Sequence, residues 1–117
     1  MKQEDKDLLL KDLCGRLPYK VKIETLDGPQ EFDIKWLSIN MCNIANPYLP
    51  YLFPLSSMTE EQKIIYGDLC YQIINATPFE IQNCFNELYD WLIKNNFDYQ
   101  GLIPMGLAID ATNLNVY

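Results

Sequence analysis

Residues 78–107, PFEIQNCFNELYDWLIKNNFDYQGLIPMGL, decide the fold. The first half repeats apolar residues at steps of three and four, which forms one continuous stripe along an α-helix. The stripe consists of Ile81, Cys84, Phe85, Leu88, Trp91 and Leu92. Pro78 suits the first helical turn, Thr77 is placed to cap it, and the Asn-Asn pair at 95–96 ends it. We predict that this helix and the apolar segment returning from it build the core on which the other elements pack.

Residues 56–75 predict a second helix. Its start carries two alternative capping boxes, Ser57 with Glu60 or Thr59 with Gln62. An apolar line then runs along the helix through Ile65, Leu69 and Ile73. Only a short Ala-Thr-Pro connection separates this helix from the next, and such a connection makes the two helices antiparallel neighbours.

Residues 3–17 predict an amphipathic N-terminal helix, because leucines recur at the spacing of one helix face. The ladder consists of Leu9, Leu13 and Leu17, with Leu10 and Cys14 beside it. Asp12 and Arg16 are opposite charges four positions apart, and such a pair contributes a few tenths of a kcal/mol on a helix surface, roughly. Pro18 ends the helix.

Two segments after this helix alternate apolar and polar side chains, as half-buried strands do. They are residues 19–26 and residues 30–39, with a turn at 27–29. Together they predict an antiparallel β-hairpin, either alone or extended to a meander by a short strand near residues 41–44. A hairpin is marginal by itself, so it must pack on the helices.

Residues 46–55, NPYLPYLFPL, contain three prolines, which exclude a helix interior or a central strand and favour an extended connection. Tyr48, Tyr51 and Phe53 lie between the prolines. Two interpretations are open at this point. The rings cover one side of the core, or they form an exposed docking surface for a protein.

The predicted fold is therefore α+β in a single domain, residues 1–117. It comprises an N-terminal helix, a small antiparallel β-hairpin or meander, two antiparallel helices and an apolar C-terminal return segment. A chain of 117 residues with 49% apolar side chains suffices for one hydrophobic core. In the tail, Leu107 and Ile109 are expected to close the core and residues 113–117 to fray.

Composition excludes several classes of function. The net charge of −7 and a single arginine, Arg16, disfavour a protein that binds the phosphate backbone of nucleic acids. Histidine is absent, which removes His-dependent catalysis and His-ligated metal sites. No membrane span or secretory leader is recognisable, so we expect a cytoplasmic protein with no membrane association.

No catalytic residue, cofactor site or metal site can be assigned from the residues. The four cysteines form no CxxC pair, and we expect them to stay reduced. A candidate pocket lies near Trp91, Asp98, Tyr99 and Gly101, where polar and aromatic side chains adjoin a glycine. Capping of the preceding helix explains the same residues without a ligand.

Three segments carry a resemblance: KDLCGRLPYKVK at 11–22, PYLFPLSSMTEEQ at 50–62 and WLIKNNFDYQGLIPMGLAID at 91–110. They resemble a set of short uncharacterised proteins of gut anaerobes, their phages and their mobile elements. The pattern there reads KDLCxRLPYGVK, PYLRPMSSMTEEE and WLNxxxFDYRGLIxxGLA. The resemblance implies a phage or mobile-element setting in a bacterial host cell, and it implies no activity, catalytic residue or cofactor.

This chain departs from the pattern at Lys20, where the pattern has Gly, and at Phe53 and Gln100, where it has Arg. It also lacks the His residues that often precede the FDY letters, here at 94–96. If those residues act in the relatives' function, this chain has lost that function. The retained letters are mostly apolar, Pro, Gly or capping residues, which favours a structural meaning for the motif.

The leading hypothesis is a non-enzymatic accessory protein that binds an unknown protein partner through Tyr48, Tyr51 and Phe53 with acidic residues around them. The alternative is a small-ligand-binding or catalytic domain with the pocket near Trp91 and Tyr99. A weaker alternative is acidic mimicry of nucleic acid, which needs carboxylates gathered on one face. An exposed apolar patch favours the first, and a concave site with polar groups favours the second. Oligomeric state is not readable from the sequence.

Overall fold

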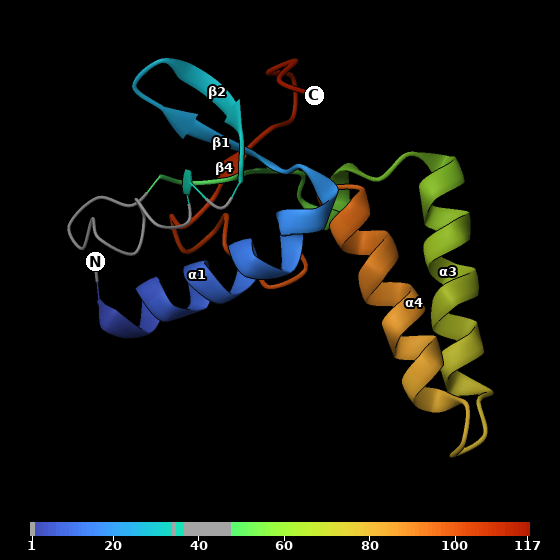
Figure 1. The fold of residues 1–117 in the computed structure, drawn as a ribbon. Helices are drawn as coiled ribbons and strands as arrows, with labels where there is room; N and C mark the ends of the chain where they lie inside the picture. Colours follow the sequence, from blue (N-terminus) through green and yellow to red (C-terminus); the bar gives the residue numbers. More distant parts are fainter. Residues whose placement is uncertain (1, 34, 37–47) are drawn as a thin grey trace.

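The computed structural model describes residues 2–33, 35–36 and 48–117. The helices are α1 (Gln3–Arg16), α3 (Glu60–Ile74) and α4 (Ile81–Lys94). The strands are β1 (Lys22–Thr25), β2 (Gly28–Glu31), β3 (Tyr51–Leu52) and β4 (Ile109–Asp110). This order confirms the predicted α+β class, with an N-terminal helix, an antiparallel two-stranded hairpin and two further helices (Figure 1).

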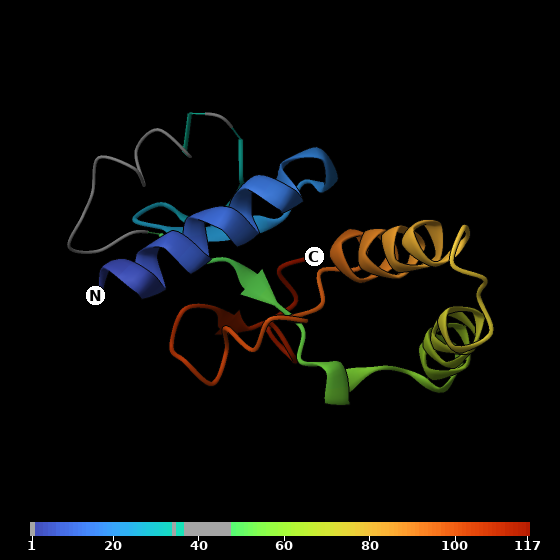
Figure 2. The same cartoon turned by 90° about the horizontal axis from the view of Figure 1, so that it is seen from below.

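The elements form two lobes that meet near the C-terminal end of α4 (Figures 1 and 2). In the first lobe α1 packs with the strands and the C-terminal segment around Leu9, Leu13, Val21, Ile23, Phe32, Leu52, Leu102, Leu107 and Ala108. In the second lobe α3 and α4 lie side by side over Met58, Leu88, Leu92 and Phe97. Residues 78–107 thus contribute to both clusters, with α4 and Phe97 in the second and with Leu102 and Leu107 in the first.

Helix α1 docks as its leucine ladder predicts, because Leu9 and Leu13 are completely buried. Cys14, which the pattern places beside the ladder, is exposed. Asp12 and Arg16 are not a surface pair, since both side chains have no exposed area. The value of a few tenths of a kcal/mol expected for a surface pair therefore does not apply to them.

Strands β1 and β2 pair antiparallel, with Thr25 opposite Gly28. The turn is tighter than the predicted 27–29, because Gly28 and Pro29 already belong to β2. Gly28 has a φ of 92°, a value that glycine adopts without steric cost.

The second strand ends at Glu31, and its predicted extension to residue 39 is wrong at Lys35 and Trp36, which are helical. Oδ1 of Asp33 accepts hydrogen bonds from the N–H groups of both residues, at 3.0 and 3.2 Å. This capping interaction starts a helical turn and overrides the alternating pattern. Residues 34 and 37–47, including the third strand expected near 41–44, lie outside the described residues.

Strand β3 belongs to a second two-stranded sheet, which agrees with the prediction that the prolines around it exclude a central strand. It pairs in parallel with β4, and Pro50 forms an isolated bridge with Ile23 of β1. The Pro50 carbonyl accepts a hydrogen bond of 2.8 Å from the N–H of Ile109. A proline lacks only the donor, so it can join a sheet where its carbonyl alone is required.

The C-terminal segment closes the first lobe. Leu107 is buried, and Ile109 pairs with Tyr51 in β3, as expected for core closure. The predicted fraying of 113–117 does not apply to Tyr117. Its hydroxyl donates to the Tyr51 carbonyl and accepts from the N–H of Lys22, and burial raises its pKa to about 12.

The structure selects the second of the two alternative capping boxes for α3. The Thr59 hydroxyl accepts from the N–H of Gln62, and the Gln62 side chain accepts from the N–H of Thr59. Helix α4 begins at Ile81, later than predicted, and its N-terminus has no side-chain cap. Thr77 instead donates its hydroxyl to Glu80 at 2.9 Å within the connecting turn.

The backbone conformation of Lys20 leads to a first testable prediction. It follows the turn of 3-10 helix at Leu17–Tyr19 in a left-handed conformation, with φ 58° and ψ 44°. This conformation costs a residue with a side chain about 1–2 kcal/mol, whereas glycine adopts it without that steric cost. We predict that Lys20→Gly raises the free energy of unfolding by about 0.5–1 kcal/mol, since the added freedom of the unfolded chain offsets part of the gain.

Urea denaturation of the purified variant measures this change. The matched control is Lys11→Gly, at an exposed position inside α1, where glycine costs about 1 kcal/mol. A loss of stability in both variants would contradict the assignment of backbone strain to Lys20.

Candidate functional site

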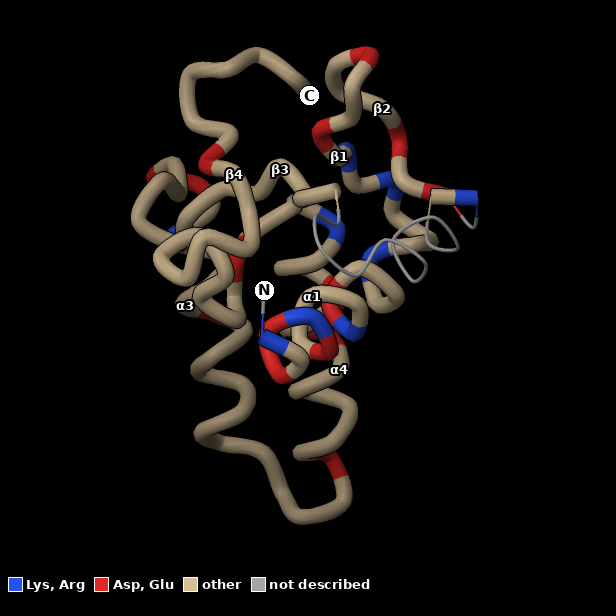
Figure 3. The backbone as a smooth tube through the Cα atoms, turned by 90° about the vertical axis from the view of Figure 1, so that its left-hand side faces the viewer, with Lys and Arg blue, Asp and Glu red and all other residues tan. Residues whose placement is uncertain are grey.

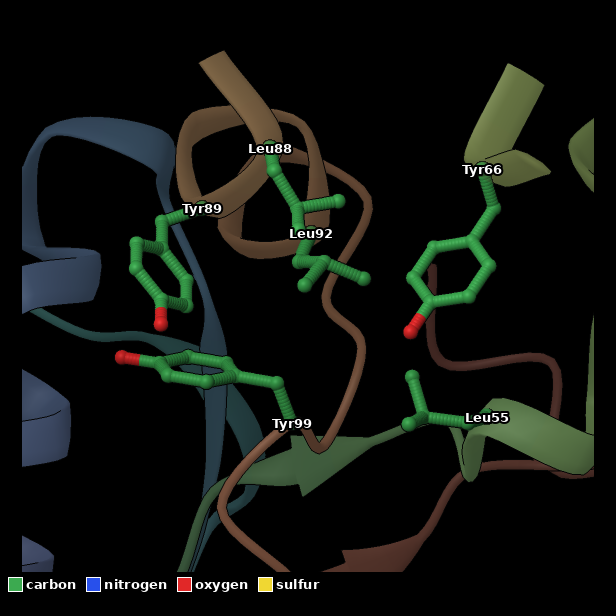
Figure 4. Close-up of a pocket in the computed structure, with 6 residues that line it drawn as sticks. All are labelled: Leu55, Tyr66, Leu88, Tyr89, Leu92 and Tyr99. Atoms are coloured by element: carbon green, nitrogen blue, oxygen red, sulfur yellow. The ribbon is translucent and has the colours of Figure 1, made fainter. Parts of the chain in front are cut away.

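A cavity of about 450 Å³ lies between α3, α4 and the loops around Leu55 and Tyr99. It is lined by Leu55, Tyr66, Leu88, Tyr89, Leu92 and Tyr99. Figure 4 shows the two α4 leucines between a pair of tyrosine rings on one side and Tyr66 with Leu55 on the other. The cavity therefore has an apolar floor and aromatic walls that come from different parts of the chain.

The floor follows directly from the stripe of α4. Leu88 and Leu92 are four positions apart and face the same side, where both are buried. Tyr66 reaches the cavity from α3, and its ring lies 6.4 Å from that of Trp91. Burial raises the pKa of Tyr66, with the neighbouring Cys70 as a further cause.

Tyr89 and Tyr99 form one wall. Their ring centroids are 5.6 Å apart, with 44° between the ring planes. Phe85 stacks on Tyr89 at 6.1 Å, and the Arg16 guanidinium lies 5.5 Å from the centre of the Tyr99 ring. Phe85 of α4 therefore supports Tyr89. Arg16 of α1 supports Tyr99 through a cation–π contact.

Arg16 belongs to a buried polar network that fixes the loop of Tyr99. Its Nε donates to Asp12 at 2.7 Å, and its Nη2 donates to the Phe97 carbonyl at 2.6 Å. Gln100 donates from Nε2 to Asp12 at 3.3 Å and to the Tyr99 hydroxyl at 3.1 Å. Burial raises the pKa of Asp12, and the Arg16 charge opposes that rise. The network joins α1 to the loop after α4.

The same network connects residues 11–22 with residues 91–110. Asp12 and Arg16 come from the first, and Phe97 to Gln100 come from the second. Among the described residues, Nη1 of Arg16 has no hydrogen-bond partner. These side chains hold α1 against the loop after α4 and so stabilise the fold.

Of the four residues predicted to form a pocket, Tyr99 alone is among the lining residues. Asp98 instead accepts from the N–H groups of Leu102 and Ile103, each at 2.8 Å, so it caps the following turn. Gly101 adopts a φ of 74° in that turn. Trp91 packs behind the cavity against Phe97, with ring centroids 5.5 Å apart.

Leu55, Tyr66 and Tyr89 also line the cavity, although the sequence pattern did not predict them there. The signal for Tyr89 was present, since it follows Leu88 at the edge of the apolar stripe of α4. Whether such a residue packs against a neighbour or borders a cavity depends on the other elements, which the spacing does not specify.

The rings of the candidate interaction surface cover the core. Tyr51 is buried, and Phe53 is half-buried with its ring 5.7 Å from that of Tyr117. Tyr48 is half-buried and meets Trp36 edge to face at 5.3 Å. The segment therefore does not present these three rings together as an exposed patch, and the first of the two interpretations fits their positions.

Several strongly exposed apolar residues lie on α3. Ile64, Gly67, Tyr71 and Ile74 recur at steps of three and four, so they share one face of the helix, which we call the outer stripe of α3. The side chains of Ile64 and Tyr71 are each 65% exposed, and that of Ile74 is 80% exposed. In the connection between α3 and α4, Phe79 is also exposed, with 95% of its side chain accessible.

The described residues contain no group of three or more Cys, Asp or Glu side chains placed to hold a metal ion. Cys14, Cys70 and Cys84 are free thiols, and Cys42 lies outside the described part of the chain. None of the helices in the described ranges is long and apolar enough to span a membrane.

No family model matches this chain, and searches among curated proteins and among solved structures found no match to it. The functional conclusions therefore depend on the geometry of the two surfaces just described, the cavity and the outer stripe of α3.

Proposed function

We propose that this chain is a non-enzymatic protein-interaction module that binds its partner through the outer stripe of α3. The setting is that of a phage or mobile-element accessory protein in the cytoplasm of a bacterial host, as the resemblance of three segments suggests. The observation that carries the proposal is the distribution of apolar residues around α3. They occupy two faces of the helix, and none of its residues is buried.

The inner face of α3 has its partner within the chain. Tyr66, Leu69, Cys70 and Ile73 pack against the cluster beneath α4. Packing against α4 requires only one apolar face. A helix with apolar residues all round is normally buried on every side. The outer stripe therefore indicates a second contact, made by another molecule.

Gly67 supports a close contact with a helix. It sits within the outer stripe, and an added Cβ at this position would meet no atom of the chain within 4 Å. Glycine inside a helix costs about 1 kcal/mol relative to alanine, and no packing within the described chain offsets that cost. A partner helix can approach the backbone of α3 closely at this point.

The net charge of the α3–α4 hairpin bears on the partner's chemistry. The α3–α4 hairpin carries Glu60, Glu61, Asp68, Glu80, Glu87 and Asp90 against Lys63 and Lys94. A partner with an apolar stripe and lysine or arginine at its edges complements this surface. We therefore propose an amphipathic helix with basic flanks, which docks in the manner of helix-in-groove recognition.

Acidic mimicry of nucleic acid receives no support from the charge distribution. Figure 3 shows acidic residues dispersed over α1, the β-hairpin, α3, α4 and the C-terminal segment, with basic residues among those of α1 and the hairpin. A mimic requires carboxylates gathered on one face.

Affinity capture from a nuclease-treated host lysate tests the proposal, with Ile64→Ser/Ile74→Ser as the variant. We expect the wild-type chain to capture a stoichiometric partner and the variant to bind the purified partner at least tenfold more weakly. Both substitutions remove exposed apolar area and leave the core intact.

The matched control is Leu26→Ser, which removes a 94% exposed leucine from the turn between β1 and β2. It should bind as the wild type does. Equal binding by the wild type and the stripe variant, or the absence of any partner, would contradict the proposed docking face.

A further inference from the structure

The cavity lined by Tyr66, Tyr89 and Tyr99 is separate from the outer stripe of α3. We infer that it binds an uncharged, planar and largely apolar small molecule that carries a hydroxyl or carbonyl group. Its size, its lining and the position of one hydroxyl lead to this ligand class.

The cavity has the size of a ligand site. Its volume is about 450 Å³, within the range of about 300–1,000 Å³ typical of small-molecule pockets. An apolar cavity of about 150 Å³ accommodates a single benzene ring. The space here is about three times larger, which suits a molecule of two or three fused rings.

The lining selects against charge. The chain has a net charge of −7, yet the six residues that line the cavity are all uncharged. A charged ligand would lose hydration there without gaining an ionic partner, which is strongly unfavourable. A neutral ligand loses little and buries apolar surface against Leu88 and Leu92.

The tyrosine pair selects for a flat ring. Tyr89 and Tyr99 are inclined to one another by 44°, and Tyr99 is held from behind by Arg16. A supported aromatic wall offers a planar ligand an offset or edge-to-face contact worth about 0.5–1.5 kcal/mol beyond the area that it buries. The wall is in place before a ligand arrives, because the Asp12–Arg16 network fixes the Tyr99 loop.

The polar group of the ligand is set by Tyr66. Figure 4 shows the Tyr66 hydroxyl directed into the space between Leu92 and Leu55, across the cavity from the tyrosine pair. A phenol both donates and accepts hydrogen bonds, so it can bind a hydroxyl or a carbonyl oxygen. The ligand then lies with its rings against Tyr99 and its oxygen toward α3.

Fluorescence titration with prodan, a neutral planar dye of two fused rings that carries a carbonyl group, tests the site on the full chain. We expect saturable binding at one site. Leu55→Trp fills the cavity from a rim position that is 38% exposed, and it should weaken binding at least tenfold. Tyr89→Ala removes one wall and should also weaken binding, and Tyr66→Phe should weaken it about fivefold through the lost hydrogen bond.

The control is Ile64→Ser/Ile74→Ser, on the outer stripe of α3, which should leave the dye affinity within twofold. This control also separates the two proposals, because a failure of dye binding says nothing against the docking face. Three results would overturn the inference: no saturable binding by the wild type, unchanged binding by both Leu55→Trp and Tyr89→Ala, or loss of binding in the stripe variant.

Discussion

Replacing Arg16 with methionine should lower the free energy of unfolding by about 3–5 kcal/mol, because the change leaves a carboxylate buried without its partner. Asp12 and Arg16 both have side chains with no exposed area, and they meet at 2.7 Å. The substitution also removes the hydrogen bond from Arg16 to the Phe97 carbonyl. Methionine fills much of the same space, so the loss reports the charge and the hydrogen bonds more than a cavity.

Urea denaturation at pH 4 and pH 8 measures the loss of stability caused by Arg16→Met and shows how this loss changes with pH. Burial already raises the pKa of Asp12 above 3.8 in the wild type, and the variant lacks the arginine that opposes this rise. The folded variant therefore binds the Asp12 proton more tightly than the unfolded chain does, and its stability falls as the pH rises above 3.8. The loss caused by Arg16→Met should be larger at pH 8 than at pH 4.

The control is the double variant Asp12→Leu/Arg16→Met. Replacing both members of a buried pair with apolar residues is often close to neutral, whereas removing one member is not. We expect the double variant to be more stable than Arg16→Met alone at pH 8. If it is less stable, the pair has a role that buried charge does not explain.

Phe97→Ala should cost about 3–5 kcal/mol, the usual loss for a phenylalanine removed from a packed core. Phe97 is 2% exposed and belongs to the cluster beneath α3 and α4. Its ring lies 5.5 Å from that of Trp91, and its N–H donates to the Leu92 carbonyl at 2.9 Å. The truncation leaves a hole where the two lobes meet.

Phe79→Ala is the matched control for this truncation. It makes the same chemical change at a side chain that is 95% exposed, so its effect on stability should stay within about 0.5 kcal/mol. Thermal unfolding followed by circular dichroism compares the two variants. Similar losses in both would mean that Phe79 is packed in solution, contrary to its position here.

The helices could be predicted well because their signals are local. The apolar stripe of α4 and the ladder of α1 are periodic, and periodicity depends on neighbouring residues alone. Two capping boxes fitted the start of α3 equally well in the sequence. The structure favours Thr59 because Ser57 uses its hydroxyl to donate to the Pro54 carbonyl at 2.7 Å, in the turn that precedes the helix.

The features that the sequence did not reveal depend on contacts between distant segments. Asp12 and Arg16 look like a surface pair until residues 97–100 fold over them. The alternation after Glu31 predicts a strand, but the local capping interaction of Asp33 prevails at Lys35 and Trp36. The candidate pocket included Tyr99 and lacked Tyr66, because a cavity is a property of how α3 and α4 pack together.

The parallel pairing of β3 with β4 has a consequence for the order in which the chain folds. These strands are far apart in the sequence, and closing the loop between them carries an entropic cost. Helices α3 and α4 fill that loop with local contacts, which form quickly. Once α3 and α4 have packed together, Phe53 lies beside Phe97. Only the short loop from Phe97 to β4 then remains to be closed before β3 and β4 can pair. We therefore expect the folding rate to depend on the helical hairpin, although α3 contributes no buried residue to the native core.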